Sequence, residues 1–346
     1  MALKPPAEVP QGAIRLNTDS QKLEFFAQDQ WWEMATKESS PIAGRALWWG
    51  GYTYGPEATQ GNSNIIDYTT IQTLGDAHDF ADATVEYRDR CNGAASYTRG
   101  VSGGGTEGNP SPALGTTIEY VTFATNANAI DFGNLGTAVR GGCALSNSTR
   151  GLFAGGSTPS KLQTIEYITI ASTGNATDFG DMTDNKTAVT TCASGTRGIF
   201  AGGFWPSFWN VIEHTTISST GNAVDFGDLT SARAQSGCAS NSVRGVMVGG
   251  YTTPSSPLTP VNIMDYISIG TLGNAQDFGD LSQGSRYNPM GASDSTRAIF
   301  GGGQPGNNIT LESIEIATKG NTVHFGNTAI RHEQAASLSN SHGGLG

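Results

Sequence analysis

Residues 148–183 read STRGLFAGGSTPSKLQTIEYITIASTGNATDFGDMT, and copies of this stretch recur along the chain. The next two copies open with TRGIFAGG at residue 196 and VRGVMVGG at residue 243. Self-similarity at a fixed period is the signature of repeat architectures, and it constrains the fold more strongly than any local propensity. We therefore derive the architecture from this repeat.

Three sets of residues mark the copies. The arginine that opens each copy recurs at steps of 54, 51, 47, 47 and 53 residues. The arginines are Arg45, Arg99, Arg150, Arg197, Arg244 and Arg297; the aromatics of the DFG-like turn are Phe80, Phe132, Phe179, Phe226, Phe278 and Phe325; the acids are Asp67, Glu119, Glu166, Glu213, Asp265 and Glu315. All three sets indicate six copies.

One full unit contains four short apolar segments, which we name strands A to D. They span residues 138–146, 150–156, 163–171 and 176–182, and a Gly-Asn pair suited to a tight hairpin separates C from D. Four antiparallel strands in about 50 residues are typical of a propeller blade. The sequence predicts an all-β fold, a six-bladed β-propeller over residues 44–346.

The two ends of the repeat array are offset. The first copy begins at strand B, over residues 44–51, and the last ends with a strand A over residues 330–340. We expect this C-terminal strand to complete the first blade, which would close the ring without an open edge.

Residues 1–43 lie outside the repeats. After a Pro-rich start, residues 12–36 alternate apolar and polar residues around two turns, which predicts a small three-stranded β-meander. Three short strands bury too little surface to be stable alone, so this module needs a partner, either the main domain or another subunit.

Composition excludes several classes of protein. The net charge of −11 argues against nucleic-acid binding, which requires a basic patch. No apolar run is long enough to span a membrane, and residues 1–13 lack the apolar core of a secretory signal. We expect no membrane insertion.

The cysteines, Cys91, Cys143, Cys192 and Cys238, occupy about the same point of four repeats, so we expect small core residues with free thiols. The cysteines do not occur in the close pairs that bind zinc, and equivalent positions on neighbouring blades should lie too far apart for a disulfide.

The Gly-Gly doublets open no helix and precede no lysine, so they predict positive-φ turns rather than a phosphate loop.

The repeated charges favour a structural interpretation, because one active site does not need six copies. We expect each strand-B arginine to pair with an acid of strand C or D. The histidines, His78, His214, His324, His332 and His342, fall at different repeat positions, which argues against a copper site. We expect no catalytic residues, no metal and no cofactor.

The loops between strands B and C differ from copy to copy, and variable loops on a rigid scaffold are where binding usually occurs. In the fourth copy this loop is Phe204-Trp205-Pro206-Ser207-Phe208-Trp209. Such a run could stack on sugars, form a subunit interface or pack locally. The candidate binding residues are Phe204, Trp205, Phe208, Trp209, Tyr52, Tyr54 and Tyr251.

Trp49 stands where the other copies have Gly, Ala or Val. A large residue at a small position needs extra space or an extra partner. We expect the N-terminal module to cover it, with Trp31 and Trp32 as interdomain contacts.

Two resemblances extend this interpretation. Arg140, Gly155-Gly156, Glu166-Tyr167 and Phe179 follow the order of kelch repeats, with Phe in place of the usual Trp of the fourth strand. Kelch propellers serve unrelated functions, so this resemblance implies the fold only.

Residues 12–32 resemble a short β-module of tailed-bacteriophage, cyanophage-type, tail fibre and baseplate proteins. The matching residues are Gly12, Ile14, Arg15, Asn17–Ser20, Lys22–Glu24, Phe26 and Trp31/Trp32. This resemblance implies a non-enzymatic structural or adhesive virion protein, assembled in the host cytoplasm. Its expected partners are other virion proteins, a host cell-surface glycan and further copies of the chain as a homo-oligomer. The alternatives are a glycan-binding propeller outside any virus and a carbohydrate-active enzyme.

Overall fold

The computed structural model describes residues 9–17, 22–33, 44–53, 61–89, 93–108, 113–253, 258–306 and 308–345. The chain forms two compact units, Met1–Pro41 and Ile42–Gly346. The boundary predicted from the sequence, between residues 43 and 44, differs from this one by two residues. The described residues form β-strands and one short 3-10 turn, η1 (Gly343–Leu345).

The N-terminal unit contains an antiparallel sheet of three strands, β1 (Ile14–Asn17), β2 (Lys22–Ala27) and β3 (Gln30–Glu33). This is the predicted meander. Its register places Ile14 opposite Phe25, and Phe25 opposite Trp32. Because side chains alternate across a strand, these three residues share one face of the sheet.

The larger unit contains six antiparallel sheets in its described part, each built on four main strands. Sheet I contains β31 (Ala336–Ser339), β4 (Arg45–Trp49), β6 (Gly61–Thr70) and β7 (His78–Arg88), extended by β5 (Tyr52–Thr53), β10 (Thr106–Glu107) and β11 (Ala113–Leu114). Sheet II contains β8 (Ala94–Ala95), β9 (Arg99–Gly103), β12 (Thr117–Thr122) and β13 (Ile130–Asn134). Sheet III contains β14 (Cys143–Ser146), β15 (Arg150–Ala154), β17 (Ser160–Thr169) and β18 (Thr177–Lys186), with β16 (Ser157–Thr158) beside β17.

The last three sheets follow the same order along the chain. Sheet IV contains β19 (Thr190–Ala193), β20 (Arg197–Ala201), β21 (Val211–Thr216) and β22 (Val224–Asp228). Sheet V contains β23 (Gly237–Ser240), β24 (Arg244–Val248), β25 (Ile263–Ser268) and β26 (Gln276–Asp280). Sheet VI contains β27 (Met290–Ser293), β28 (Arg297–Gly301), β29 (Thr310–Glu315) and β30 (Val323–Asn327). The four-strand unit predicted for residues 138–182 is thus present, although its strand A is confined to β14.

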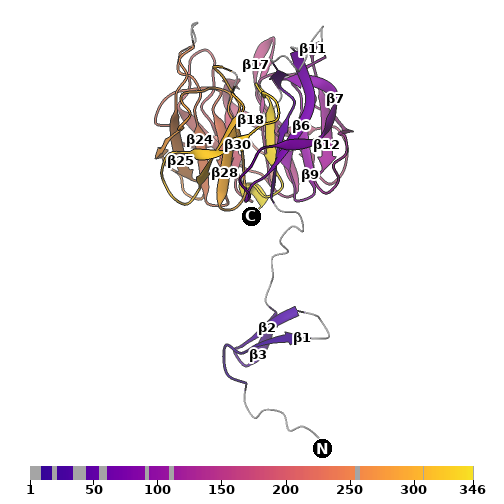
Figure 1. Ribbon diagram of the computed structural model, residues 1–346, viewed down its shortest axis with the longest axis vertical. Coiled ribbons are helices and arrows are strands. Elements are labelled where there is room, and N and C mark those ends of the chain that lie inside the picture. Colours follow the sequence, from indigo (N-terminus) through magenta and orange to yellow (C-terminus); the bar gives the residue numbers. More distant parts are fainter. Residues whose placement is uncertain are drawn as a thin grey trace, which may run out of the picture. The chain divides into compact units, whose positions relative to one another are not determined.

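The first strand of sheet I comes from the far end of the chain. β31 pairs with β4, placing Ala336 opposite Trp49 and Ser339 opposite Ala46. This is the predicted pairing, and Figure 1 places the C-terminus at one edge of the larger unit.

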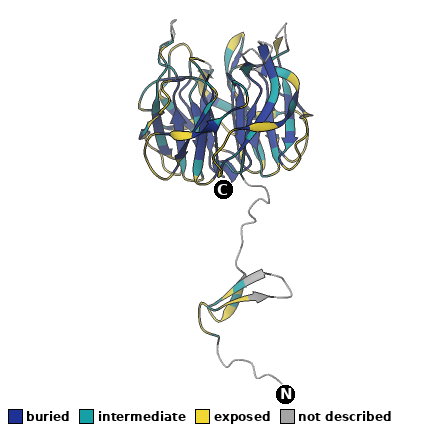
Figure 2. Cartoon of the chain, viewed as in Figure 1, coloured by how far each residue is buried: buried dark blue, intermediate teal, exposed yellow. Residues whose placement is uncertain are grey.

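Buried apolar clusters lie between neighbouring sheets, and buried residues line the strands in Figure 2. Separate clusters join sheets I and II, II and III, III and IV, IV and V, and V and VI. A further cluster joins sheet VI to sheet I, where Ile299 and Phe325 pack with Trp48. Each sheet therefore buries both of its faces.

The strand-B arginines do not form the predicted ion pairs with strand C or D, with one exception. Among the described residues, Arg297 alone bridges such an acid, Glu315, at 3.1 Å. Each guanidinium instead donates to a backbone carbonyl at the end of strand C of the next sheet. The acceptors are Phe123, Ile170, Ile217, Ile269, Ile316 and Ile71 for Arg45, Arg99, Arg150, Arg197, Arg244 and Arg297 respectively. Four of these arginines also lie over a tyrosine of their own sheet, 4.6–4.9 Å from the ring centroid.

The glycine of the DFG-like turn is required by close approach between sheets. Gly180 has φ of +144°, and an ideal Cβ there would lie 2.6 Å from the carbonyl oxygen of Gly221 in the next sheet. The Gly221 N–H donates to the carbonyl of Phe179 at 2.8 Å. The Gly155-Gly156 doublet has φ of +62° and +96°, which confirms the predicted positive-φ turn.

The acid of strand C is a buried residue in five of the six sheets. In sheet VI the acid predicted from the sequence is the wrong one. Glu312, not Glu315, faces Phe300 across the strands, as Asp265 faces Met247 in sheet V. Glu312 is buried, whereas Glu315 lies three residues later at the exposed end of β29.

A basic residue in the segment leading into a sheet binds this acid. Arg233 bridges Asp265 at 2.8 Å, Arg286 bridges Glu312 at 2.6 Å, and Lys186 bridges Glu213. His332 bonds Asp67 at 3.0 Å in sheet I. In sheet III no described cation pairs with Glu166, and burial raises the pKa of its carboxyl.

The described cysteines are free thiols on the first strands of their sheets, as predicted: Cys143 on β14, Cys192 on β19 and Cys238 on β23. Cys91 lies outside the described residues. Burial, followed by a hydrogen bond with Cys192, raises the pKa of the Cys238 thiol.

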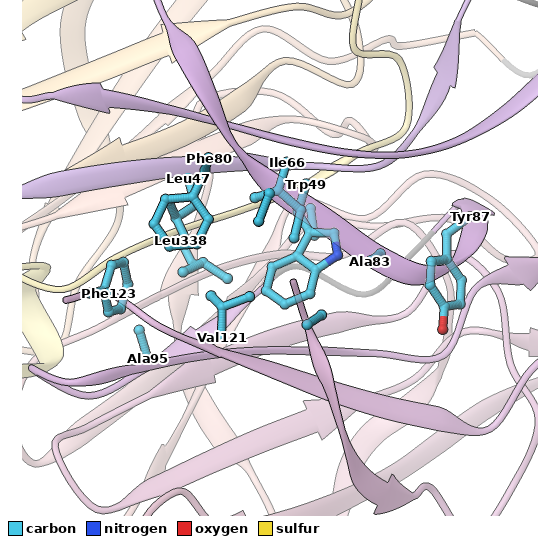
Figure 3. Packing of buried hydrophobic residues seen from close by; sticks show 13 residues of the cluster. Leu47, Trp49, Ile66, Phe80, Ala83, Tyr87, Ala95, Val121, Phe123 and Leu338 are labelled. Atoms are coloured by element: carbon cyan, nitrogen blue, oxygen red, sulfur yellow. The ribbon is translucent and has the colours of Figure 1, made fainter. Parts of the chain in front are cut away.

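The expectation that Trp49 needs the N-terminal module to fill its surroundings is wrong. Figure 3 shows its ring among Ile66, Ala83 and Val121, all residues of its own unit. The indole is fully buried in the cluster between sheets I and II. Extra space is available here because sheet II supplies small side chains such as Ala95. Whether Trp31 and Trp32 contact another domain stays a prediction.

Candidate functional site

The loops between strands B and C and the linkers between strands D and A lie on one face of the larger unit, which we call the variable face. Isolated bridges join the two kinds of segment: Arg140 with Ser157, Thr187 with Phe204, Ala234 with Tyr251, Tyr287 with Gln304, and Glu333 with Tyr52. The loop residues of these bridges follow the Gly-Gly doublet of each sheet. Phe204, Tyr251 and Tyr52 are therefore equivalent positions.

The aromatic loop of sheet IV folds back on itself between β20 and β21. Phe204 pairs with Phe208 across the loop, and the Trp205 N–H donates to the carbonyl of Ser207 at 2.9 Å. The indole of Trp209 donates to the carbonyl of Trp205 at 2.8 Å. These bonds hold the side chain of Trp205 at the tip, where 48% of its surface is exposed.

Five aromatic side chains form a continuous row over sheets IV to VI, which we call the aromatic row. In order they are Trp205, Phe204, Phe208, Tyr251 and Tyr287. Successive ring centroids are 6.3, 5.1, 5.2 and 5.5 Å apart, and three of the four contacts are edge-to-face. These are the separations and geometry that aromatic pairs prefer. The side chains after Trp205 are half-buried, so the row is a firm surface with one exposed end.

Positive charge lies beside the row. The ammonium of Lys161 lies 5.7 Å from the Trp205 ring centroid, and that of Lys186 lies 4.9 Å from that of Trp209. Lys186 is buried and paired with Glu213. Trp209 therefore covers an internal ion pair, which gives it a packing role that the sequence did not reveal.

The structure brings together only part of the predicted binding set. Phe204, Trp205, Phe208 and Tyr251 lie in the row, and Trp209 lies beneath its exposed end. Tyr52 lies on sheet I, where its backbone pairs with Glu333, and Tyr54 lies outside the described residues.

Sequence analysis missed Tyr287. It lies in a D–A linker, and only the B–C loops were compared between repeats. Aligning the linkers as well would have placed Tyr287 beside the position of Gln304 in sheet VI. Burial, followed by the proximity of Tyr287, raises the pKa of the Tyr251 hydroxyl.

The described residues contain no group of three or more His, Cys, Asp or Glu side chains arranged to hold a metal ion. Of the histidines, His332 bonds Asp67 and His214 packs edge-on against Phe226. No helix in this part of the chain is long and apolar enough to cross a membrane.

Comparison with known proteins gives no family. No protein-family model matches the sequence, and no curated protein matches it. Function must therefore be argued from the residues of this chain.

Proposed function

We propose that the six sheets of the larger unit are the blades of a closed six-bladed β-propeller. The arginine bonds support closure, because they run from each sheet to the next and then from Arg297 of sheet VI to Ile71 of sheet I. The apolar clusters run through the same cycle. Contacts between first strands do so too, since β31 meets both β27 and β8.

We propose further that the chain is a non-enzymatic structural or adhesive protein of a bacteriophage particle, part of a tail fibre or baseplate. Its N-terminal module would attach it, and the variable face would bind a host surface or a neighbouring virion protein. The observation that carries the binding role is the aromatic row. The row presents the exposed indole of Trp205 on a firm aromatic surface, and aromatic side chains of this kind dominate binding energies. The viral setting rests on the resemblance of residues 12–32.

The test replaces Trp205 by alanine. Its side chain is the exposed end of the row, so the substitution removes little internal packing. Loss of one aromatic anchor should weaken partner binding by about 1–2 kcal/mol, roughly tenfold. Leu272→Ala is the matched control, because Leu272 is also exposed, at 57%, but follows strand C rather than strand B.

The variant should be introduced into phage particles that otherwise lack the chain. An assembly contact predicts fewer incorporated copies, whereas a receptor contact predicts normal particles that adsorb poorly. Normal incorporation together with normal adsorption would rule out both.

A glycan-binding propeller outside any virus is the second candidate, favoured by the exposed indole of Trp205 with Lys161 beside it. Mass spectrometry of purified particles separates the two settings, because only the virion protein would be found there at fixed stoichiometry.

A further inference from the structure

Six equivalent residues of the D–A linkers form a collar at the centre of the variable face. They are Asp89, Gly141, Ala188, Gln235, Asn288 and Gln334, with φ of +52°, +61°, +58°, +54°, +54° and +55°. Five of the six are not glycine, and left-handed backbone is uncommon for such residues.

Backbone hydrogen bonds join the collar from linker to linker. The N–H of Gly141 donates to Asp89, that of Ala188 to Gly141, that of Gln235 to Ala188, and that of Asn288 to Gln235, at 2.8–3.0 Å. Neighbouring sheets thus position the collar side chains against one another.

The collar surrounds a recess lined by four of its polar side chains and by Ser236. The recess has a cavity volume of about 60 Å³ and is open to solvent. Pro289 lines both this recess and a cavity among the first strands of the sheets. No lysine or arginine belongs to the described lining of the recess.

The side chains of the recess suit hydroxyl groups. The amides of Gln235, Asn288 and Gln334 can each donate and accept, and Asp89 accepts. The Nδ2 atom of Asn288 is buried and meets no acceptor among the described residues. A buried donor without a partner is costly, and a ligand hydroxyl would satisfy it. Among the described residues, the lining holds one carboxylate and no lysine or arginine, which disfavours an anionic ligand.

One end of the aromatic row is joined to the collar through the backbone. Tyr287 directly precedes Asn288, and Tyr251 pairs with Ala234, which directly precedes Gln235. A sugar presents hydroxyl groups, which protein amides can hydrogen-bond, and apolar ring faces, which pack on aromatic side chains.

We propose that the recess binds a neutral saccharide unit, with Asn288 and Gln235 hydrogen-bonding its hydroxyls and the aromatic row contacting the next unit. This deepens the proposed adhesive function and rests on it for the biological source of the ligand, a cell-surface glycan.

The test uses the full chain and saturation-transfer NMR with the methyl glycosides of glucose, galactose, mannose and N-acetylglucosamine. N-acetylneuraminic acid is the anionic comparison. At least one neutral glycoside should bind, and Asn288→Ala with Gln235→Ala should weaken its affinity about tenfold or more. Alanine is tolerated at this position of the collar, because Ala188 occupies it in another linker with the same φ. Gln276→Ala, at the start of β26 and away from the collar, should leave binding unchanged.

Three results would overturn the proposal: no neutral glycoside binds, the double variant binds as the unchanged chain does, or only the anionic sugar binds. A fourth result would also overturn it: calcium binding without sugar binding, measured by calorimetry with calcium chloride, would make the recess a cation site. Failure here leaves the adhesive function standing if Trp205→Ala still reduces assembly or adsorption. Conversely, the recess would bind sugar without the aromatic row binding a partner if a neutral glycoside binds and Trp205→Ala leaves assembly and adsorption normal.

Discussion

At the scale of single residues, one side chain performs the same task in every repeat. The strand-B arginine reaches a carbonyl of the next sheet instead of an acid of its own. Arginine suits this position because its planar guanidinium stacks on a tyrosine and still donates hydrogen bonds. The buried acids are then free to bind the linkers, which fixes the base of the variable face.

The Arg233–Asp265 pair permits a quantitative prediction. Both side chains are fully buried, and Thr230 also bonds the Asp265 carboxylate. Arg233→Met leaves a buried carboxylate without its cation and should lower the free energy of unfolding by about 3–5 kcal/mol. Urea titration measures this. Asp265→Leu in the same chain should recover part of the loss, and a double variant no more stable than Arg233→Met would contradict the interpretation.

His342 gives a prediction about pH. Its ring lies near the carbonyl of Ala95 at 3.1 Å and the hydroxyl of Ser146 at 3.2 Å, and burial lowers its pKa from 6.5 to about 4. The unfolded chain therefore takes up a proton at higher pH than the folded chain. The stability due to the neutral ring is complete above pH 6.5 and declines as pH falls towards 4.

Melting temperatures measured between pH 7 and pH 4 check this. His342→Gln should show a shallower decline than the unchanged chain over that interval. If the melting temperatures of the two chains decline in parallel as pH falls, protonation of His342 does not cause the loss of stability.

At the scale of elements, the N-terminal sheet has two unlike faces. On one, Arg15 bonds Glu24 and lies 4.1 Å from the Trp31 ring centroid, and Phe26 packs against Trp31. On the other, Ile14, Phe25 and Trp32 are 64%, 37% and 43% exposed. This second face carries no described charge, so a second copy of the same face can pack on it.

We therefore expect Phe25→Ser with Trp32→Ser to dissociate a homo-oligomer of the full chain. Sedimentation measures the mass directly. Ile130→Ser, which changes an exposed apolar residue of sheet II, should leave the mass unchanged. Equal masses for all three chains would assign the face to a different partner or to none.

Regular strands could be predicted from the sequence because their signals repeat. Strands B, C and D carry arginine, acid and aromatic markers, and their positions follow from alternation. The short strands of the B–C loops were missed because their side chains do not repeat: β5, β10 and β16 each follow a Gly-Gly doublet, and β11 lies in the same loop as β10. The turn η1 lies in the tail, outside the repeats. The error at Glu315 has the same origin, since two glutamates lie three residues apart in β29 and only burial distinguishes them.

Only part of the candidate site could be predicted, because only part of it is continuous in the sequence. The run of aromatics in residues 204–209 is visible in sequence, but its continuation through Tyr251 to Tyr287 depends on which segments lie side by side. The collar was not predictable at all. Its residues are Asp, Gly, Ala, Gln and Asn, and only their shared backbone conformation identifies them.

At the scale of the whole molecule, the C-terminal segment would close the ring of the propeller that we propose. β31 is the first strand of sheet I, Asn340 accepts a hydrogen bond from the Arg45 N–H at 2.8 Å, and His332 binds Asp67. Truncation after residue 328 removes all of these and exposes Trp49, which lies opposite Ala336. We expect the loss to spread through the unit, because each sheet shares a buried cluster with both neighbours.

Calorimetry of three chains tests this expectation. Truncation after residue 328 should abolish the single cooperative transition, whereas truncation after Asn340 keeps β31 and should retain it. A permutant that begins at residue 329, joins residue 345 to residue 44 by a flexible linker and ends at residue 328 should also retain it, because the strand is present although its place in the chain has changed. If the first truncation melts as cooperatively as the full chain, the pairing of β31 with β4 is dispensable and closure does not stabilise the ring. If the permutant fails while the chain ending at Asn340 folds, the order of synthesis matters more than the pairing.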